Sequence, residues 1–125
     1  FRDFYYCDSG MIPWLVVASI FGEQKRKMSE LVDSRIKKYP SSGERNYRVG
    51  DPHALLKKVK EKYSAEAKSI EEFDGLSVSF EKWRFNIRLS NTEPLVRLNV
   101  ESRGEKKLVE DKVKEIESLV RINFD

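Results

Sequence analysis

The sequence predicts an α+β fold, in which an antiparallel four-stranded sheet carries two helices on one face and is preceded by further helices. Four segments alternate apolar and polar residues in the manner of half-buried strands: 44–49, 76–80, 83–87 and 95–101. Two segments with apolar residues at helical spacing, 52–63 and 105–122, follow the first and the last of these strands. A more apolar helical segment, 11–21, comes before all of them.

The composition is that of a folded domain with a modest core. The 125 residues are 36% charged and 39% hydrophobic, and the apolar residues recur periodically, which argues against disorder. The net charge of +3 is only a mild bias toward anionic partners. A single Cys7 and a single His53 exclude an internal disulfide and a Cys/His zinc site. We therefore expect a reducing, cytoplasmic location.

We expect no targeting signal in the N-terminal residues. The longest apolar run, 11–21, is interrupted by Pro13 and Ser19 and is shorter than the roughly 20 apolar residues of a membrane span, so we expect no membrane partner. The opening residues lack the charged segment and cleavage site of a signal peptide. Because the chain begins on Phe1 within an aromatic-rich stretch, we interpret it as a fragment of a longer protein.

The first predicted helix covers 11–21, with Asp8 or Ser9 as its cap, Pro13 in its first turn and Gly22 at its end. It is apolar nearly all round, which is typical of a helix buried on every side. We expect a domain absent from this sequence to cover it. The alternative is an interaction module that binds another protein through this helix.

A polar link at 24–27 leads to a second helix at 30–39, which Ser29 begins. The run Pro40-Ser41-Ser42-Gly43 then interrupts the chain, and we expect a hinge there. The link is basic, but short charged runs usually only face solvent.

Asp51 and Pro52 have the residue types of an N-cap and a first helical position, and they begin the helix at 52–63. His53 lies in its first turn without a second metal ligand at a suitable spacing, so it is interpreted as an exposed helix residue. Residues 69–72 are predicted to be a loop or last turn. Gly75 ends a turn signal that requires a positive φ.

The segment Arg88-Leu89-Ser90-Asn91-Thr92-Glu93-Pro94 connects the last two strands, and its side chains can hold an oxyanion. Arg88 offers a planar fork of charged donors, Ser90 and Thr92 offer hydroxyls, and Asn91 offers an amide. Successive backbone N–H groups in such a turn can form a concavity that binds anions. The alternative is an ordinary turn, because turns favour Asn and Ser for their local hydrogen bonds.

The run RLSNTEP followed by LVRLNVESR resembles the phosphate-binding loop in the last domain of the α-D-phosphohexomutases, the phosphomannomutase and phosphoglucomutase family. The opening YYCDSGMIP resembles a segment of the third domain of these enzymes. The resemblance implies that 1–40 are the C-terminal helices of that α/β third domain. It also implies that 41–125 are the complete fourth domain, with a TATA-box-binding-protein-like fold. The stretches DGLSVSF and WRFNIRLSNTEPLVRLNVESR are most similar to bacterial phosphomannomutases of GDP-mannose synthesis.

The family reaction interconverts hexose 6-phosphate and hexose 1-phosphate through a bisphosphorylated sugar, with a phosphoserine and Mg²⁺. Mannose phosphates are the favoured substrates here, and glucose or glucosamine phosphates are the alternatives. The resemblance implies that this part clamps the non-reacting phosphate and closes the active site together with the missing domains. The phosphoserine loop and the Mg²⁺ ligands have no counterpart in this sequence. We therefore expect no catalytic residue, no bound metal and no mutase activity of the chain alone.

The phosphate ligands that the resemblance carries over by position are Arg88, Ser90, Asn91 and Thr92. Arg97 is a weaker candidate, because a strand arginine can simply pair with a surface carboxylate. Glu93 is expected to point away from the phosphate, toward Arg97. Asn99 stands where some relatives place a second arginine, which leaves that second clamp in doubt.

A second function class is a small basic nucleic-acid-binding module, in which Trp83 and Phe85 would stack on bases. Both aromatic residues alternate with polar ones at strand period, which places them in the core instead. The sequence therefore favours a phosphorylated hexose as the partner, and no nucleic acid.

Overall fold

The computed structural model describes residues 1–25 and 27–121. By its internal contacts it divides into two compact units, Phe1–Arg35 and the chain from Ile36 onward. The helices that precede the sheet are η1 (Arg2–Phe4), α1 (Met11–Gln24) and α2 (Met28–Lys38). Among the described residues, no helix has both the length and the apolar character that a membrane crossing requires.

Helix α1 extends past its predicted end. Gly22 lies inside the helix, so the prediction that it terminates the helix is wrong. The chain instead leaves the helix at Lys25, which is left-handed at φ 49° and donates its N–H to Phe21 O at 3.0 Å. At the other end, the Ser9 hydroxyl accepts the Met11 N–H at 3.3 Å. Arg26, in the predicted polar link, lies outside the described residues.

The sheet has five antiparallel strands in the order β1-β5-β4-β3-β2. Their bounds are β1 (Arg45–Arg48), β2 (Ser69–Glu71), β3 (Leu76–Ser79), β4 (Trp83–Leu89) and β5 (Leu95–Ser102). The α+β prediction is confirmed, but the predicted number of strands is one too few. The sequence predicts a loop or last turn at 69–72, yet residues 69–71 pair with β3 as an edge strand. So short a strand contains too few residues for alternation to be detected, and only its neighbour gives it strand geometry.

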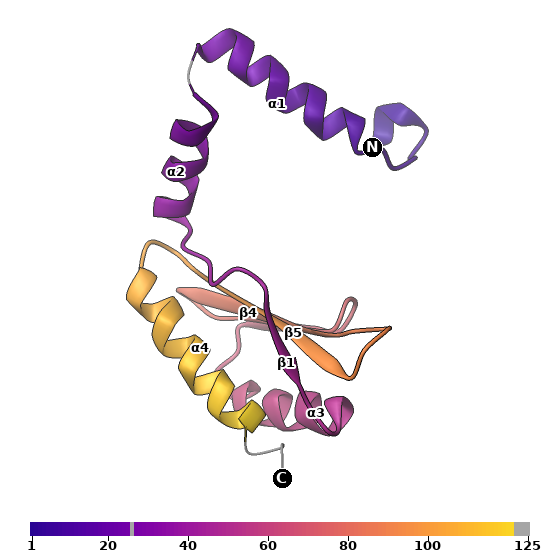
Figure 1. Ribbon diagram of the computed structural model, residues 1–125, viewed down its shortest axis with the longest axis vertical. Coiled ribbons are helices and arrows are strands. Elements are labelled where there is room, and N and C mark those ends of the chain that lie inside the picture. The colour runs from indigo at the N-terminus through magenta and orange to yellow at the C-terminus, as the bar shows by residue number, and fades with distance from the viewer. Residues whose placement is uncertain (26, 122–125) are drawn as a thin grey trace. The chain divides into compact units, whose positions relative to one another are not determined.

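Helices α3 (Pro52–Tyr63) and α4 (Lys106–Arg121) cover one face of the sheet (Figure 1). The predicted cap of α3 is confirmed, because Asp51 Oδ1 accepts the Ala54 N–H at 2.9 Å. The predicted last residue of the C-terminal helix, Ile122, lies outside the described residues. The side chains that α3 buries against the sheet are Leu55, Val59 and Tyr63, and those that α4 buries are Val109, Val113, Ile116 and Val120.

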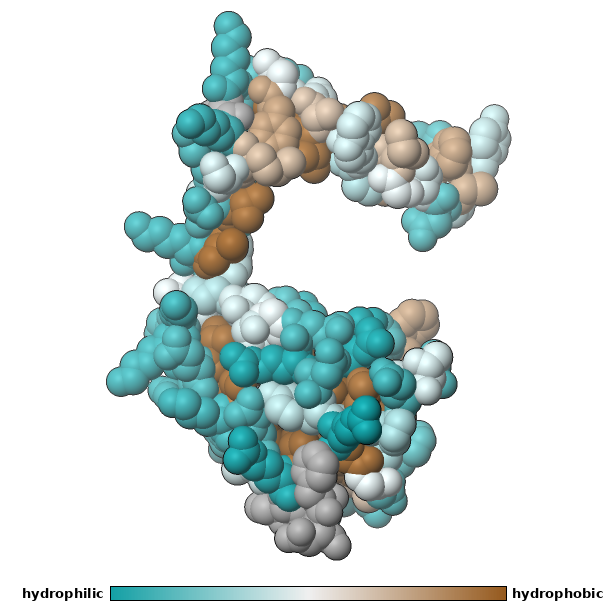
Figure 2. All heavy atoms as spheres, viewed as in Figure 1, coloured by the Kyte–Doolittle hydropathy of each residue, from teal (hydrophilic) through white to brown (hydrophobic). Residues whose placement is uncertain are grey.

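The two units differ in what they bury. The sheet-bearing unit has a continuous apolar core, and Figure 2 shows mostly hydrophilic side chains on its surface. Helix α1 buries none of its residues, although its sequence predicts burial on all faces, and apolar side chains gather along it in the same view. The candidate site therefore has to be sought on the sheet-bearing unit, where the fold fixes side-chain positions.

Candidate functional site

The sheet face that carries no helix presents three rows of polar side chains. Strand β4 supplies Arg84, Asn86 and Arg88 to this open face, and their direct partners on β5 are Glu101, Asn99 and Arg97. In order toward the 90–92 loop, the first row is the Arg84–Glu101 ion pair, the second is two asparagines and the third is two arginines. Like charges directly opposite each other on neighbouring strands are destabilising. The Arg88–Arg97 row therefore requires compensation from another part of the chain.

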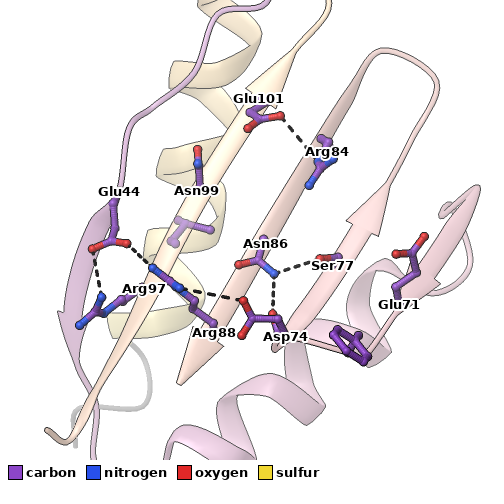
Figure 3. Close-up of a pocket in the computed structure, with 12 residues that line it drawn as sticks. Glu44, Glu71, Asp74, Ser77, Arg84, Asn86, Arg88, Arg97, Asn99 and Glu101 are labelled. Atoms are coloured by element: carbon purple, nitrogen blue, oxygen red, sulfur yellow. Dashed lines mark hydrogen bonds and ion pairs between the residues drawn. The ribbon is translucent and has the colours of Figure 1, made fainter. Parts of the chain in front are cut away.

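Glu44, which immediately precedes β1, supplies that compensation (Figure 3). Its Oε2 accepts a hydrogen bond from Arg88 Nη2 at 2.8 Å, and its Oε1 lies 3.6 Å from Arg97 Nη1. On the other side of Arg88, Asp74 Oδ2 lies 4.0 Å from Nη1. The hydrogen bond from Arg88 lowers the pKa of Glu44, and the same bond raises the pKa of Arg88.

A hollow of about 260 Å³ lies where β4 runs into its loop. It is lined by Asp74, Arg88, Leu89, Ser90, Asn91, Thr92 and Arg97. All five residues predicted to bind phosphate thus line one depression, although they come from two strands and a loop. The structure brings them together, and their binding of phosphate stays a prediction.

Backbone hydrogen bonds fix the shape of this loop. Ser90 N–H donates to Leu95 O at 3.0 Å, and Leu95 N–H donates to Glu93 O at 2.8 Å. The Ser90 hydroxyl accepts the Thr92 N–H at 3.4 Å and lies 3.4 Å from the Thr92 hydroxyl. Two hydroxyl groups therefore gather beside the arginines, as a site for an oxyanion requires.

Arg97 has one donor without a partner. Its Nε is buried and has no hydrogen-bond partner among the described residues, although the guanidinium pairs with Glu44. The expected pair of Glu93 with Arg97 is therefore wrong, and Glu93 is exposed. Buried donors are nearly always hydrogen-bonded, so the described residues leave this arginine incompletely satisfied. Asn99, in the next row, accepts the Ser41 hydroxyl at 2.9 Å instead of lining the loop hollow.

The turn between β2 and β3 presses directly on the site. Gly75 has φ +77°, as its turn predicts, and a Cβ there would lie 2.3 Å from Ile87 O and 2.6 Å from Arg88 Cα. Only glycine permits this approach. The contact also places Asp74, whose carbonyl accepts the Asn86 Nδ2–H at 2.9 Å. Sequence reasoning missed the roles of both Glu44 and Asp74, because Glu44 was only the first residue of a predicted strand and Asp74 only part of a turn.

The alternative of a nucleic-acid-binding module loses its support. Trp83 and Phe85 are only 8% and 1% exposed and face the helices, so they offer no surface on which bases could stack. His53 is exposed, as predicted. The part of the chain that the structure describes contains no group of three or more His, Cys, Asp or Glu side chains that could hold a metal ion.

Comparison with known proteins agrees with this geometry. A family model described as "Phosphoglucomutase/phosphomannomutase, C-terminal domain" matches residues 44–119, which include the whole sheet and the loop. The chain belongs to this family. The resemblance seen in the sequence is thereby confirmed, together with the α+β fold.

Individual proteins similar to this chain are named as phosphomannomutases or phosphohexose mutases. A phosphomannomutase of Salmonella montevideo is 52% identical over 120 residues, which are 96% of this chain and 26% of that protein. A phosphomannomutase of Escherichia coli K12 is 47% identical over the same shares. The phosphohexose mutases of Xanthomonas campestris pv. campestris are 46% identical over 97% of this chain and 27% of their own length. The chain therefore spans about a quarter of the length of these relatives.

Proposed function

We propose that this chain is the phosphate-binding C-terminal part of a phosphohexomutase that interconverts mannose 6-phosphate and mannose 1-phosphate through a bisphosphorylated sugar. The observation that carries the proposal is the loop hollow, which gathers two arginines, two hydroxyls and an amide from separate elements. The relatives named as phosphomannomutases support mannose as the hexose. Phosphoglucomutase and phosphoglucosamine mutase activities are the alternatives within the family.

The task proposed for this part is to hold the phosphate that does not react. Arg88 and Arg97 would donate charged hydrogen bonds to the phosphate oxygens through guanidinium N–H groups that Glu44 does not contact. The hydroxyls of Ser90 and Thr92 and the amide of Asn91 would complete the grip. Binding energy from this remote group orients the sugar for reaction at its other end, which raises the rate without any covalent role for this part.

The same grip must accept either phosphate of the sugar and release it when the intermediate turns round. The two arginine side chains are 40% and 36% exposed, so a phosphate can reach them and leave them. The hinge expected at 40–43 does not fit the structure, because β5 binds the Ser42 N–H and the Pro40 carbonyl at 2.8 and 2.9 Å. We therefore propose that the chain bends before Pro40 when the active site closes. We place the whole enzyme in the cytoplasm.

The phosphoserine and the Mg²⁺ of the family mechanism would belong to the rest of a full-length mutase. We therefore expect the pure chain not to convert mannose 6-phosphate. Turnover by the chain alone would contradict this division of labour. Under the proposed division of labour, the other domains of the same polypeptide are the main partners of this one.

The test is an NMR titration of the ¹⁵N-labelled chain with mannose 1-phosphate, compared with Arg88→Ala and Arg84→Ala. Arg84 is the matched control, because it lies on the same strand and face but outside the loop hollow. A charged hydrogen bond contributes about 1.5–3 kcal/mol, so Arg88→Ala should weaken binding by about ten- to a hundredfold. Saturable shifts at 88–92 should disappear in that variant and persist in Arg84→Ala. Equal affinity of all three proteins would refute the proposed clamp.

In the full-length enzyme, Arg88→Ala should lower kcat/KM by a similar factor. Mannose and glucose 1-phosphates compared as substrates would decide between the hexoses.

A further inference from the structure

We infer that Glu44 is a positioning residue of the phosphate site, whose carboxylate holds Arg88 and Arg97 side by side from behind and leaves their remaining N–H groups to the loop hollow. The inference rests on the proposed phosphate clamp and adds to it a residue outside the loop motif. Glu44 would not touch the phosphate itself.

The need for such a residue follows from the register of β4 and β5. Arg88 and Arg97 are direct cross-strand partners on the open face, so two positive charges lie next to each other before any ligand binds. Without a counter-charge the two side chains would separate into solvent, and each would have to be ordered again when a phosphate bound. One carboxylate that contacts both guanidinium groups removes most of that repulsion and keeps them together.

The position of Glu44 shows that it acts from behind and not as an occupant of the site. Arg45 pairs with Leu98, so Glu44 lies toward Asn99, on the side of the arginine row away from the loop. Arg88 and Arg97 line both the loop hollow and a neighbouring hollow of about 380 Å³ on the open face, whereas Glu44 lines only the second. Figure 3 shows its carboxylate between the two guanidinium groups.

The remaining donors of the arginines are suited to a phosphate. Each guanidinium has five N–H donors, and Glu44 contacts one nitrogen of each. The hydrogen bond with Arg88 lowers the pKa of Glu44, which shows that this contact favours the charged carboxylate. Asp74 is a weaker neighbour at 4.0 Å, with a largely exposed side chain.

The test compares the wild-type chain with Glu44→Gln and Glu101→Gln. Glu101 is the matched control, because its side chain has the same 43% exposure and pairs with Arg84 on the same face. NMR relaxation of the arginine Nε–Hε groups in the free chain reports how well Arg88 is ordered. Titration with mannose 1-phosphate reports affinity. We expect Glu44→Gln to mobilise Arg88 and to weaken binding about tenfold, and Glu101→Gln to do neither.

A double variant shows whether Glu44 works through the arginine. If it does, adding Glu44→Gln to Arg88→Ala should weaken binding by clearly less than the tenfold seen in the wild-type background. A full tenfold effect in both backgrounds would refute the positioning role. The Glu44 and Arg88 side chains are 43% and 40% exposed, so neither Glu44→Gln nor Arg88→Ala should impair folding. Urea unfolding of each variant verifies this.

The outcomes separate this inference from the proposed function. Tighter phosphate binding by Glu44→Gln would mean that the carboxylate competes with the ligand, and unchanged binding would mean that it only neutralises charge. Either result overturns the inference while loss of binding in Arg88→Ala still supports the clamp. If Arg88→Ala binds as well as the wild type, the clamp itself fails, and the inference fails with it.

Discussion

The two faces of the sheet are built from the same strands, yet they have opposite chemistry. On β4, Phe85 and Ile87 are at most 1% exposed and pack beneath the helices, while Arg84 and Arg88 alternate with them on the open side. Burial of apolar area contributes about 25 cal/mol per Å², whereas an exposed ion pair contributes at most about 1 kcal/mol. The covered face therefore supplies the stability, and the open face can carry charges that serve binding.

The contrast between the faces also explains why the candidate site lies at one end of the open face. At that end, side chains of two strands and a loop meet, and like charge faces like charge across the strands. The row at the other end is self-compensating, with Arg84 pairing with Glu101 at 3.7 Å. The Arg88–Arg97 row contains two positive charges and no carboxylate of its own, so it is the row that an anion can bind most readily.

The sharpest test of this contrast uses adjacent residues of one strand. Phe85→Ala should lower the free energy of unfolding by about 3–5 kcal/mol, because it empties part of the aromatic cluster of Tyr63, Phe80 and Trp83. Arg84→Ala, one residue earlier and on the open face, should change it by no more than about 0.5 kcal/mol. Urea unfolding of the two variants measures both values. Similar losses in the two proteins would show that the faces do not divide the work as described.

A smaller effect is expected at Gly75, where a turn meets the site. Gly75→Ala should destabilise the chain by about 1–3 kcal/mol and displace Arg88, because the new Cβ would meet Ile87 O and Arg88 Cα. Gly104→Ala is the matched control, since Gly104 also has a positive φ, +87°, but a Cβ added there would meet no atom within 4 Å. Unfolding experiments and the Arg88 amide shift would report the difference. If both variants lose the same stability, backbone strain alone explains the result and the close approach has no role.

The smallest expected effect lies where two tyrosines donate hydrogen bonds to carboxylates of α4. Tyr47 donates to Glu117, and Tyr63 donates to Glu115 at 2.8 Å. Burial and then the Glu117 carboxylate raise the pKa of Tyr47 to about 12, and burial and then the Glu115 carboxylate also raise the pKa of Tyr63. In the unfolded chain the tyrosine hydroxyls ionise near pH 10. The stability that these two hydroxyls contribute is therefore complete below pH 10 and is lost as the pH rises toward 12 and above.

Urea midpoints at pH 8 and pH 11 test this sign. Tyr63→Phe should lose about 1 kcal/mol at pH 8 and show a shallower fall with pH than the wild type. Tyr5→Phe is the control, because Tyr5 is 91% exposed, and it should follow the wild type at both pH values. A steeper alkaline fall in Tyr63→Phe would contradict the assigned hydrogen bond.

Local patterns in the sequence were sufficient for much of this fold. Alternation identified four of the strands, Asp51 and Pro52 marked the start of α3, and Gly75 required its positive φ. Local patterns did not predict the edge strand at 69–71, which is defined by its pairing with β3. They also predicted wrongly that the helix ends at Gly22, because a glycine is only a weak helix breaker.

What the sequence determined by itself is therefore the set of loop residues that could hold a phosphate and the faces on which the strand residues lie, because both follow from residue type and a period of two. What only the tertiary structure decided is which distant charges meet them. Glu44 reaches Arg88 across 44 positions of the chain, through the pairing of β1 with β5 and of β5 with β4. Such a contact depends on strand order and register, which no local pattern encodes.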